Sequence, residues 1–268
     1  MPLDMIVCIK WVPNTQAVRI DPKTGTLIRE GVPSIINPHD LDALELALKL
    51  KDKYGGTVTV LSMAPPSAVL GLEHAIGMGA DKAVLLSDRA FAGADTLATS
   101  YTLYKAIERI GGFDVVFTGQ ETIDSSTAHI GAQIASWLNV PYIYYVEKAE
   151  YIEDKRVLRV WRTLEDAKEV YDIKLPAVVS VAMKSNPPRR ISLLNKVRAK
   201  IEKPIEIWSN QVMQLEPNCI GLRGSPTRVV KIEFMPTVPR KKMIFKGDPK
   251  EAAKWLLDKL IEDGVIEL

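Results

Sequence analysis

The chain has 268 residues, of which 47% are hydrophobic and 25% are charged, and its formal net charge at pH 7 is +2. This length and composition suit one sizeable α/β domain, or one domain with an extension, around an ordinary core. The near-neutral charge argues against nucleic-acid binding, and two cysteines, Cys8 and Cys219, cannot form a disulfide framework and suit a reducing cytosol.

Short apolar runs alternate with longer segments of helical period over the first 145 residues. The runs predict strands at residues 5–9, 57–63, 82–86, 113–117 and 142–146. The longer segments predict helices at residues 39–53, 66–78, 95–110 and 127–138. In the second helix we expect Val69, Leu70 and Ile76 to face inward. The run at residues 5–9 is too short for a secretion signal or a membrane span, so we expect no membrane insertion and a cytoplasmic location.

Strands separated by helices of this length require parallel crossover connections. We therefore predict an α/β fold with a doubly wound, mostly parallel, Rossmann-like sheet. Ligands of such sheets lie beyond the carboxyl ends of the strands. The candidate site is thus formed by the loops after Ile9, Met63, Leu86 and Phe117.

The pattern changes after Val146. Residues 150–161 and 169–175 predict a polar hairpin, and residues 176–182 predict one more buried strand. From residue 186 the chain is rich in Pro, Lys and Arg and has little periodicity. Such a stretch cannot bury a core of its own, so it is either a loose tail or an arm that wraps a partner. We predict a domain over residues 1–185 and an arm over residues 186–268.

A final helix is predicted at residues 249–262. Asp248 is a good N-cap, Pro249 suits the first helical position, and Glu251 completes a capping box. The helix has an apolar face and ends at Gly264. Its face consists of Ala252, Trp255, Leu256 and Leu260.

Several common catalytic and phosphate-binding motifs are absent from the sequence. It contains no G-x-x-x-x-G-K-[ST], no G-x-G-x-x-G after the first strand, no G-x-S-x-G and no zinc-type Cys/His spacing. We therefore do not expect an enzyme that acts alone.

The loop at residues 119–131 follows a predicted strand and leads into a predicted helix. Free amides and the helix dipole make such a place suitable for a phosphate. The alternative is a plain N-cap by Asp124, Ser125, Ser126 or Thr127, which spacing alone favours. Residues 37–40 allow the same two interpretations, with Asn37 or Asp40 as the cap. His39 is either a ligand-facing ring or a solvated residue of the first turn.

Taken in order, several segments resemble the beta subunit of electron transfer flavoproteins over nearly the whole chain. They are Val7-Cys-Ile-Lys10-Trp-Val-Pro13, Gly31-Val-Pro-Ser-Ile-Ile-Asn37-Pro38 with Asp40 and Ala43-Leu44-Glu45, Gly79-Ala80-Asp81, Gly119-Gln120 with Ile123-Asp124 and Gly131, Lys174-Leu-Pro-Ala-Val-Val179, Pro188-Arg189 and Gly224-Ser-Pro-Thr-Arg228. Bifurcating and nitrogen-fixation-type members of the family are the more similar group.

The resemblance implies an adenine-nucleotide-binding domain whose C-terminal arm embraces an alpha subunit. In the family, the alpha subunit holds most of the electron-transferring FAD, and the beta subunit holds AMP or a second, bifurcating FAD. Electrons come from a dehydrogenase or NADH and pass to quinone-reductase or ferredoxin-type partners. The residues implied to touch the nucleotide are Cys8, Asn37, Pro38, His39, Asp40, Ser62, Met63, Ala64, Pro65, Pro66, Gly119, Gln120, Asp124, Ser125, Ser126, Thr127, Ala128, His129, Ile130 and Gly131.

One departure concerns the nucleotide loop. The family pattern is Asp-x-Asp-Thr-x-Gln, whereas this chain has Asp124-Ser-Ser126-Thr127-Ala-His129. Ser126 replaces the second aspartate of the pattern, which removes the repulsion between a carboxylate and a diphosphate. His129 replaces the glutamine and keeps a hydrogen-bond donor at that position. We expect the site to survive, with the identity of its nucleotide left open.

Residues 188–195 resemble the family's recognition loop, which docks redox partners through an exposed leucine. Leu193 is the matching position, with Leu194 beside it and Arg189 and Arg190 in a basic rim. The alternative is an ordinary turn that carries both leucines into the core. For the whole chain, the alternative function is a stand-alone nucleotide-binding or nucleotide-hydrolysing protein of the same superfamily.

Overall fold

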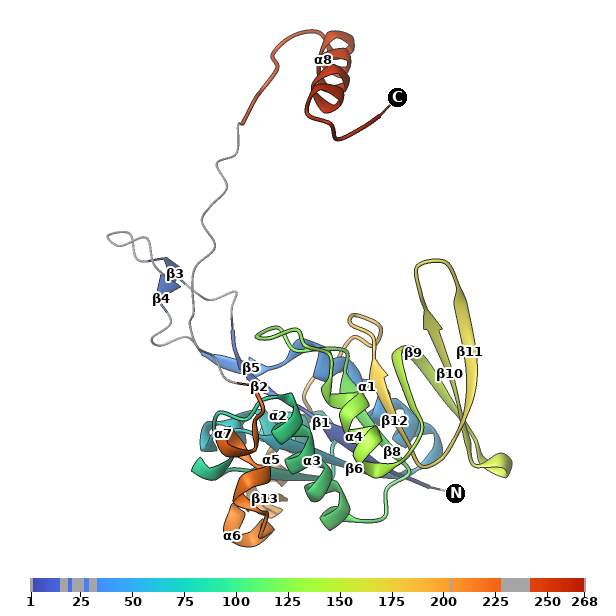
Figure 1. Cartoon of the computed structure of the whole chain (residues 1–268). Helices are drawn as coiled ribbons and strands as arrows, with labels where there is room; N and C mark the ends of the chain where they lie inside the picture. Colours follow the sequence, from blue (N-terminus) through green and yellow to red (C-terminus); the bar gives the residue numbers. More distant parts are fainter. Residues whose placement is uncertain are drawn as a thin grey trace. The chain divides into compact units, whose positions relative to one another are not determined.

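The computed structural model describes residues 2–14, 33–202, 204–227 and 242–267, together with two short strands at residues 19–20 and 27–28. The chain divides into a compact unit, Met1–Arg228, and a second unit, Val229–Leu268 (Figure 1).

A nine-stranded sheet forms the centre of the first unit, in the order β11-β10-β9-β12-β8-β1-β6-β7-β13. The neighbours from β9 to β13 are all parallel, and β10 and β11 are antiparallel. The bounds are β1 Leu3–Cys8, β6 Gly56–Met63, β7 Lys82–Leu86, β8 Val115–Gly119, β9 Tyr142–Ile152, β10 Val157–Thr163, β11 Lys168–Lys174, β12 Ala177–Val181 and β13 Ile205–Trp208. Two small sheets pair β2 (Trp11–Pro13) with β5 (Ser34–Ile36) and β3 (Arg19–Ile20) with β4 (Leu27–Ile28).

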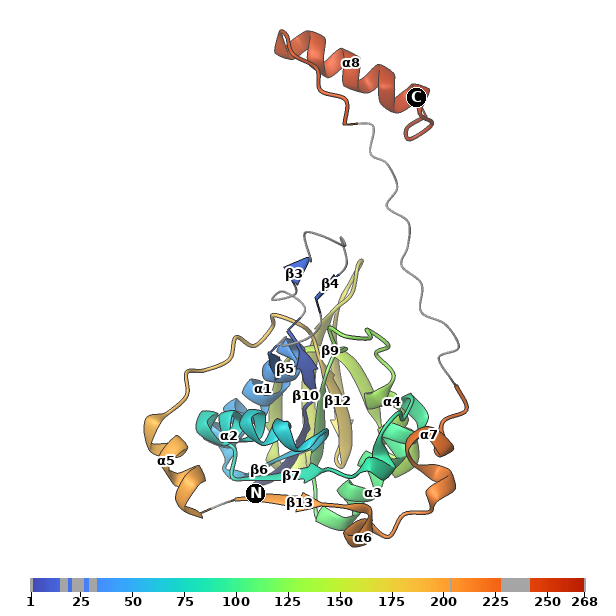
Figure 2. The same ribbon diagram turned by 90° about the vertical axis from the view of Figure 1, so that its left-hand side faces the viewer.

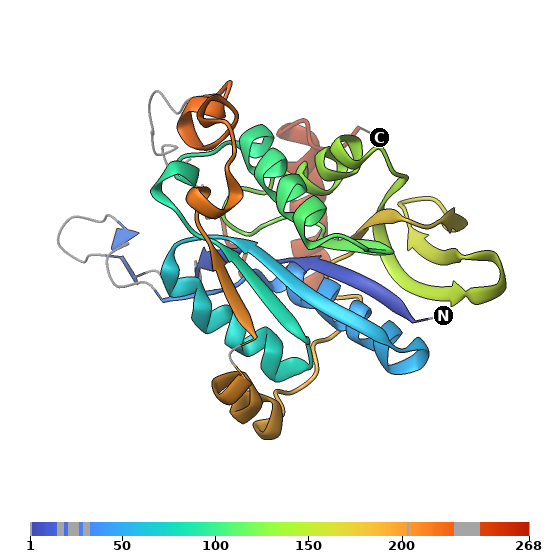
Figure 3. The ribbon, with the colours of Figure 1, turned by 90° about the horizontal axis from the view of Figure 1, so that it is seen from below.

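Helices cover both faces of the sheet. In Figure 3, α1 and α2 lie on one side and α3 and α4 on the other. β1 shows why: Met5 and Val7 pack in one core cluster with Leu44 of α1, whereas Ile6 packs in the other with Ile107 of α3. The helices are α1 Pro38–Tyr54, α2 Val69–Met78, α3 Thr96–Ile110, α4 Ile130–Leu138, α5 Leu193–Glu202, α6 Asn210–Met213, α7 Gly221–Gly224 and α8 Pro249–Glu262, with short 3-10 turns η2 Pro66–Ala68, η3 Arg89–Phe91, η4 Glu153–Lys155 and η5 Pro217–Cys219. The predicted doubly wound, mostly parallel α/β fold is confirmed.

The connections change direction at β1. From β1 the chain passes through α1 and α2 to β6 and β7 on one side, and α3 then returns it to β8 on the other side of β1. Figure 2 shows α1 and α2 on one side of the sheet and α3 and α4 on the other. The carboxyl ends of β1 and β8 therefore flank the switch point, where open parallel sheets bind their ligands.

Most predicted elements are present, but some details were wrong. The strand predicted at residues 113–117 is β8, which lies two positions later, and the helix predicted from residue 127 begins at Ile130. Ser126 and Ala128 have φ angles of 49° and 55°, a left-handed conformation that no α-helix contains. In α2, Ile76 is buried, but Leu70 is 66% exposed.

The predicted polar hairpin is part of the main sheet. β9 runs on from the predicted strand at residues 142–146 to Ile152, pairs with β10, and β10 pairs with β11. The three strands extend the sheet beyond β12.

Residues 186–227 belong to the compact unit. β13 pairs with β7, with Ile205 opposite Ala83 and Trp208 opposite Leu86, and so forms the edge of the sheet. The compact unit thus extends to Arg228, past the boundary predicted after residue 185. That residues beyond 185 wrap a second chain stays a prediction.

In the second unit, α8 occupies the predicted residues. The Asp248 carboxylate accepts a hydrogen bond from the Lys250 N–H at 2.8 Å, and Phe245 packs on Trp255 with ring centroids 5.5 Å apart. No described residue of α8 is buried. Among the described residues, none of the helices combines the length and apolar character needed to cross a membrane.

Candidate functional site

A cavity of about 620 Å³ lies at the carboxyl edge of the sheet, at the switch point between β1 and β8. Parallel strands bring their following loops to this edge, so residues far apart in sequence meet here. The predicted site residues that line the cavity are Cys8, Asp40, Met63, Gly119, Gln120, Ser125, Thr127, Ala128, His129, Ile130 and Gly131.

The other predicted residues are not among those that line the cavity. They are Asn37, Pro38, His39, Ser62, Ala64, Pro65, Pro66, Asp124 and Ser126. His39 is buried, and its Nδ1 has no hydrogen-bond partner among the described residues, so the interpretation as a solvated residue was wrong.

One wall of the cavity was not predicted from the sequence. It is formed by the loop after β7 and the start of α3, with Thr227 beside it. The loop after Leu86 was among the four loops predicted to form the site, but none of its residues was predicted as a site residue. The lining residues not predicted are Ile9, Lys10, Phe91, Gly93, Ala94, Asp95, Thr96, Thr99, Leu103, Thr118, Glu121, Thr122 and Thr227.

Asp95 holds this missed wall together. One carboxylate oxygen accepts hydrogen bonds from the N–H groups of Leu97 and Ala98 and caps α3. The other accepts hydrogen bonds from the Thr227 N–H at 3.1 Å and hydroxyl at 2.8 Å. The Asp95 N–H donates to the Ser225 hydroxyl at 2.8 Å. Asp95 therefore fixes Thr227 at the rim of the cavity.

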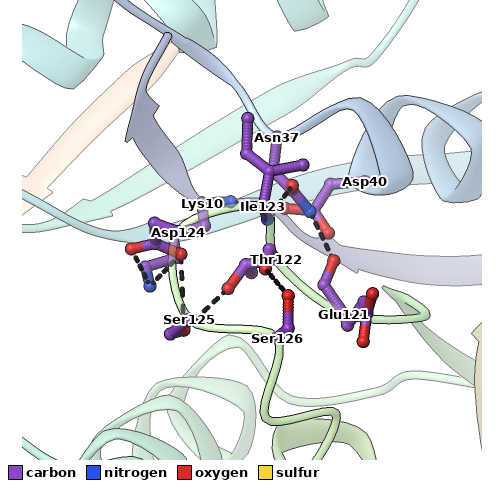
Figure 4. Close-up of polar contacts among 9 residues, drawn as sticks. All are labelled: Lys10, Asn37, Asp40, Glu121, Thr122, Ile123, Asp124, Ser125 and Ser126. Carbon is purple, nitrogen blue, oxygen red and sulfur yellow. Dashed lines mark hydrogen bonds and ion pairs between the residues drawn. The ribbon is translucent and has the colours of Figure 1, made fainter. Parts of the chain in front are cut away.

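The loop between β8 and α4 also lines the cavity. Figure 4 shows the polar contacts of this loop. The Thr122 carbonyl accepts a hydrogen bond from the Ser126 N–H at 2.8 Å, and the Thr122 and Ser125 hydroxyls are 3.0 Å apart. This turn forces Ser126 into the left-handed region, which is costly for a residue other than glycine. His129 occupies the N-cap of α4 without a side-chain cap, so the interpretation of Asp124, Ser125, Ser126 or Thr127 as the cap was wrong.

Two residues from the other side of the switch point hold the loop. The Asn37 side chain donates to the Glu121 carbonyl at 2.8 Å and accepts from the Ile123 N–H at 3.2 Å. The Lys10 ammonium group lies 2.6 and 2.9 Å from the two carboxylate oxygens of Asp124. Burial alone would raise the pKa of Asp124, but the hydrogen bond and charge of Lys10 bring it below its ordinary value.

Asp40 lies at the floor of the cavity and does not cap α1. Its carboxylate accepts the Lys10 N–H at 2.7 Å. Burial raises the pKa of Asp40 to about 7, against the opposing effect of hydrogen bonds from Lys10, Asn37 and Gly119. Burial, and then the charge of Asp40, raise the pKa of the neighbouring Cys8 thiol to about 12. Cys8 is therefore a neutral thiol at physiological pH and not a thiolate nucleophile.

Close packing under the loop requires two glycines. A Cβ on Gly119 would lie 2.3 Å from the Asp40 Oδ1, and one on Gly131 would lie 2.9 Å from the Thr118 hydroxyl. That hydroxyl is buried in the cavity wall and has no hydrogen-bond partner in the part of the chain that the structure describes. A buried polar group without a partner costs free energy, so a ligand with a hydrogen-bonding group fits this position.

The predicted docking residues lie away from the cavity. Leu193 and Leu194 are 77% and 78% exposed, so the alternative that they enter the core was wrong. The Arg189 guanidinium contacts the buried carboxylate of Glu45 at 2.9 and 3.1 Å and Asp52 at 2.8 Å. Arg189 thus fastens this segment to α1, whereas Arg190 is exposed.

The described residues contain no cluster of three or more His, Cys, Asp or Glu side chains able to hold a metal ion. In the cavity wall, Lys10 is the only Lys or Arg among the described lining residues, beside the carboxyl groups of Asp40, Asp95 and Glu121. An anion bound here would depend on Lys10 and on backbone N–H groups.

The chain is similar to known proteins over most of its length. The family model described as "Electron transfer flavoprotein domain" matches residues 24–212. The chain is 45% identical to "Electron transfer flavoprotein subunit beta" of Clostridium acetobutylicum, over 98% of this chain and 100% of that protein. It is also 45% identical to "Caffeyl-CoA reductase-Etf complex subunit CarD" of Acetobacterium woodii, over 98% and 99%, and 44% identical to "Protein FixA" of Sinorhizobium fredii, over 94% and 89%.

Proposed function

The chain belongs to the electron transfer flavoprotein family, among its beta subunits, and from this premise we propose that it binds an adenine nucleotide in the cavity and relays electrons together with an alpha subunit. The observation that carries the proposal is the position of the cavity. It lies at the switch point of a parallel sheet, beneath a loop that leads into α4.

The residues present suit a nucleotide with phosphates. The loop N–H groups and the start of α4 favour an anion, and Lys10 supplies a positive charge. The unpartnered Thr118 hydroxyl supplies a hydrogen-bonding group, and Gly119 and Gly131 leave room for the Asp40 carboxylate and the Thr118 hydroxyl in the cavity wall. Thr127 adds a hydroxyl to the cavity wall.

The nucleotide is FAD or AMP. A bound FAD would supply reversible uptake and release of electrons, whereas AMP would not. In either case the chain's own residues bind and orient the nucleotide, and acid–base catalysis by the protein is not needed for electron carriage. The neutral thiol of Cys8 contributes to the wall of the site and not to covalent chemistry.

The proposed partner is an alpha subunit that holds the electron-transferring FAD. We propose that α8 docks on it through the apolar face that includes Trp255 and Leu256. Leu193 and Leu194 are proposed to dock redox partners: a dehydrogenase or NADH-dependent donor, and quinone-reductase or ferredoxin-type acceptors. We propose the cytoplasm as the place of action.

The test is a nucleotide count. The chain is co-expressed with its alpha subunit, purified gently and denatured, and the released nucleotides are identified by chromatography. FAD at two per heterodimer supports electron bifurcation, and one FAD with one AMP supports simple carriage. A heterodimer that releases one FAD and no other nucleotide would contradict the proposed site.

A further inference from the structure

Asn37 occupies the N-cap position of α1, but its side chain does not cap the helix. An asparagine at this position usually accepts a hydrogen bond from the second or third N–H of its own helix. Here both ends of the amide bind loop 120–129 instead, through the Glu121 carbonyl and the Ile123 N–H. The side chain is completely buried, at 0% exposure. The amide therefore binds a loop 84 residues away, and it also donates a hydrogen bond to the Asp40 carboxylate.

The backbone around Asn37 is itself fixed to the end of β1. The Asn37 N–H donates to the Lys10 carbonyl at 2.9 Å, and the Lys10 N–H donates to Asp40 at 2.7 Å. Asn37 thus joins the end of β1, the start of α1 and the loop, as Figure 4 shows.

The loop requires stabilising contacts from outside because its backbone conformation is unfavourable on its own. Ser126 and Ala128 both have left-handed backbones, which persist only where the surroundings enforce them. The Lys10–Asp124 ion pair is partly exposed, and pairs of this kind contribute little. The turn at Thr122 joins residues within the loop and does not attach the loop to the sheet. The two side-chain hydrogen bonds of Asn37 are buried and attach the middle of the loop to the start of α1.

Asn37 does not line the cavity, whereas Glu121 and Thr122 do. From this geometry we propose that Asn37 is a positioning residue, whose amide holds loop 120–129 in the shape that receives the nucleotide. This inference rests on the proposed function.

The experiment compares Asn37→Ala with a matched control, Asn210→Ala. The Asn210 amide also makes two hydrogen bonds to the backbone of a loop, to the N–H and the carbonyl of Leu215 at 3.0 and 3.2 Å, but it does not line the cavity. Each variant is purified as the heterodimer with its alpha subunit, depleted of the beta-site nucleotide and titrated separately with AMP and with FAD.

We expect Asn37→Ala to weaken binding of the preferred nucleotide about tenfold or more, from the loss of two hydrogen bonds that order the loop. Asn210→Ala should bind like the wild type. Without nucleotide, the Ile123 amide should exchange its hydrogen faster in Asn37→Ala, because its acceptor is gone. A purely structural role would lower stability in both variants and leave affinity unchanged.

Asn37→Ser keeps a single hydroxyl in place of the amide and adds no buried charge beside Asp40. We expect an intermediate loss of affinity, and this variant decides the question if Asn37→Ala does not fold. Wild-type affinity in both Asn37 variants, or an equal loss in Asn210→Ala, would overturn the positioning role alone. A wild-type heterodimer that binds neither AMP nor FAD would overturn the proposed function, and the positioning role with it.

Discussion

Helices α1 and α8 begin with similar sequences and have different surroundings. Each follows an N-cap Asn or Asp and has a proline at its start and an acidic residue in its first turn. The Asp248 side chain caps α8. The Asn37 side chain accepts no hydrogen bond from the N–H groups of α1 and binds the loop over the cavity. Many residues of α1 are buried, and no described residue of α8 is.

The difference shows that a capping sequence locates the start of a helix but does not decide what the cap residue does. Packing against the sheet stabilises α1, so its cap residue is available for the site. α8 has no buried residue among those described, so local interactions such as its N-cap stabilise it, and its apolar side chains Leu256 and Leu257 are exposed. We therefore expect substitutions in the two regions to have separate effects. Substitutions near α1 should weaken nucleotide binding, and substitutions in α8 should weaken binding of the alpha subunit.

The largest expected effect is at the loop. Thr127→Glu places a carboxylate in the cavity wall, where the phosphate is proposed to lie. At roughly 4 Å and an effective dielectric near 20, the repulsion is about 4 kcal/mol, or about a thousandfold in affinity. Nucleotide analysis of the purified heterodimer should show loss of the beta-site nucleotide, with the alpha-held FAD and the heterodimer intact. A full nucleotide complement would place the site elsewhere.

A second effect concerns pH and the floor of the same site. Because the pKa of Asp40 is raised from 3.8 to about 7, the folded state holds more protons than the unfolded state between these values. The free energy of unfolding should therefore fall as pH rises through this window, by up to about 1.4 kcal/mol per pH unit, and level off above it. Urea unfolding of wild type and Asp40→Asn at a series of pH values measures the difference. Parallel curves for the two proteins would show that Asp40 titrates normally.

In α8, the expected effect is on the partner alone. If Trp255 and Leu256 bury fully on the alpha subunit, each contributes roughly 1.5–3 kcal/mol. Trp255→Ala should weaken heterodimer formation accordingly, as measured by analytical ultracentrifugation over a dilution series. Unfolding of the compact unit should be unchanged, since no described residue of α8 is buried. Unaltered association would mean that another surface holds the partner.

The smallest expected effect is at Leu193, which belongs to the compact unit yet is more exposed than Leu256 of α8, at 77% against 53%. Leu193→Ala should slow electron transfer to the physiological partner, with a loss of about 1–2 kcal/mol in binding, as is common for a central interface residue. Flavin content and the flavin spectrum should stay the same. Stopped-flow kinetics at several partner concentrations would reveal the change, and identical kinetics would remove Leu193 from the docking surface.

The sequence predicted the alternation of strands and helices because buried runs and helical periods are local features. It did not predict the late start of α4, which depends on contacts from Asn37 and Lys10, distant in sequence. Nor did it reveal β13, a short strand whose identity depends on pairing with β7. In the site, the loop after β8 was predicted from its position, whereas the wall built by Asp95 and Thr227 requires the two segments to meet in space.

Thr227 has a consequence for assembly kinetics. Asp95 fixes Thr227 at the cavity rim, so the chain that follows is covalently attached beside the proposed nucleotide site. If the proposed alpha subunit binds residues 242–267, any further contact that it makes at this rim would be intramolecular. The effective concentration of such a contact depends on linker length and reaches the millimolar range for short flexible linkers. Weak contacts around the proposed nucleotide would then be sufficient, and they could break and reform without loss of the partner.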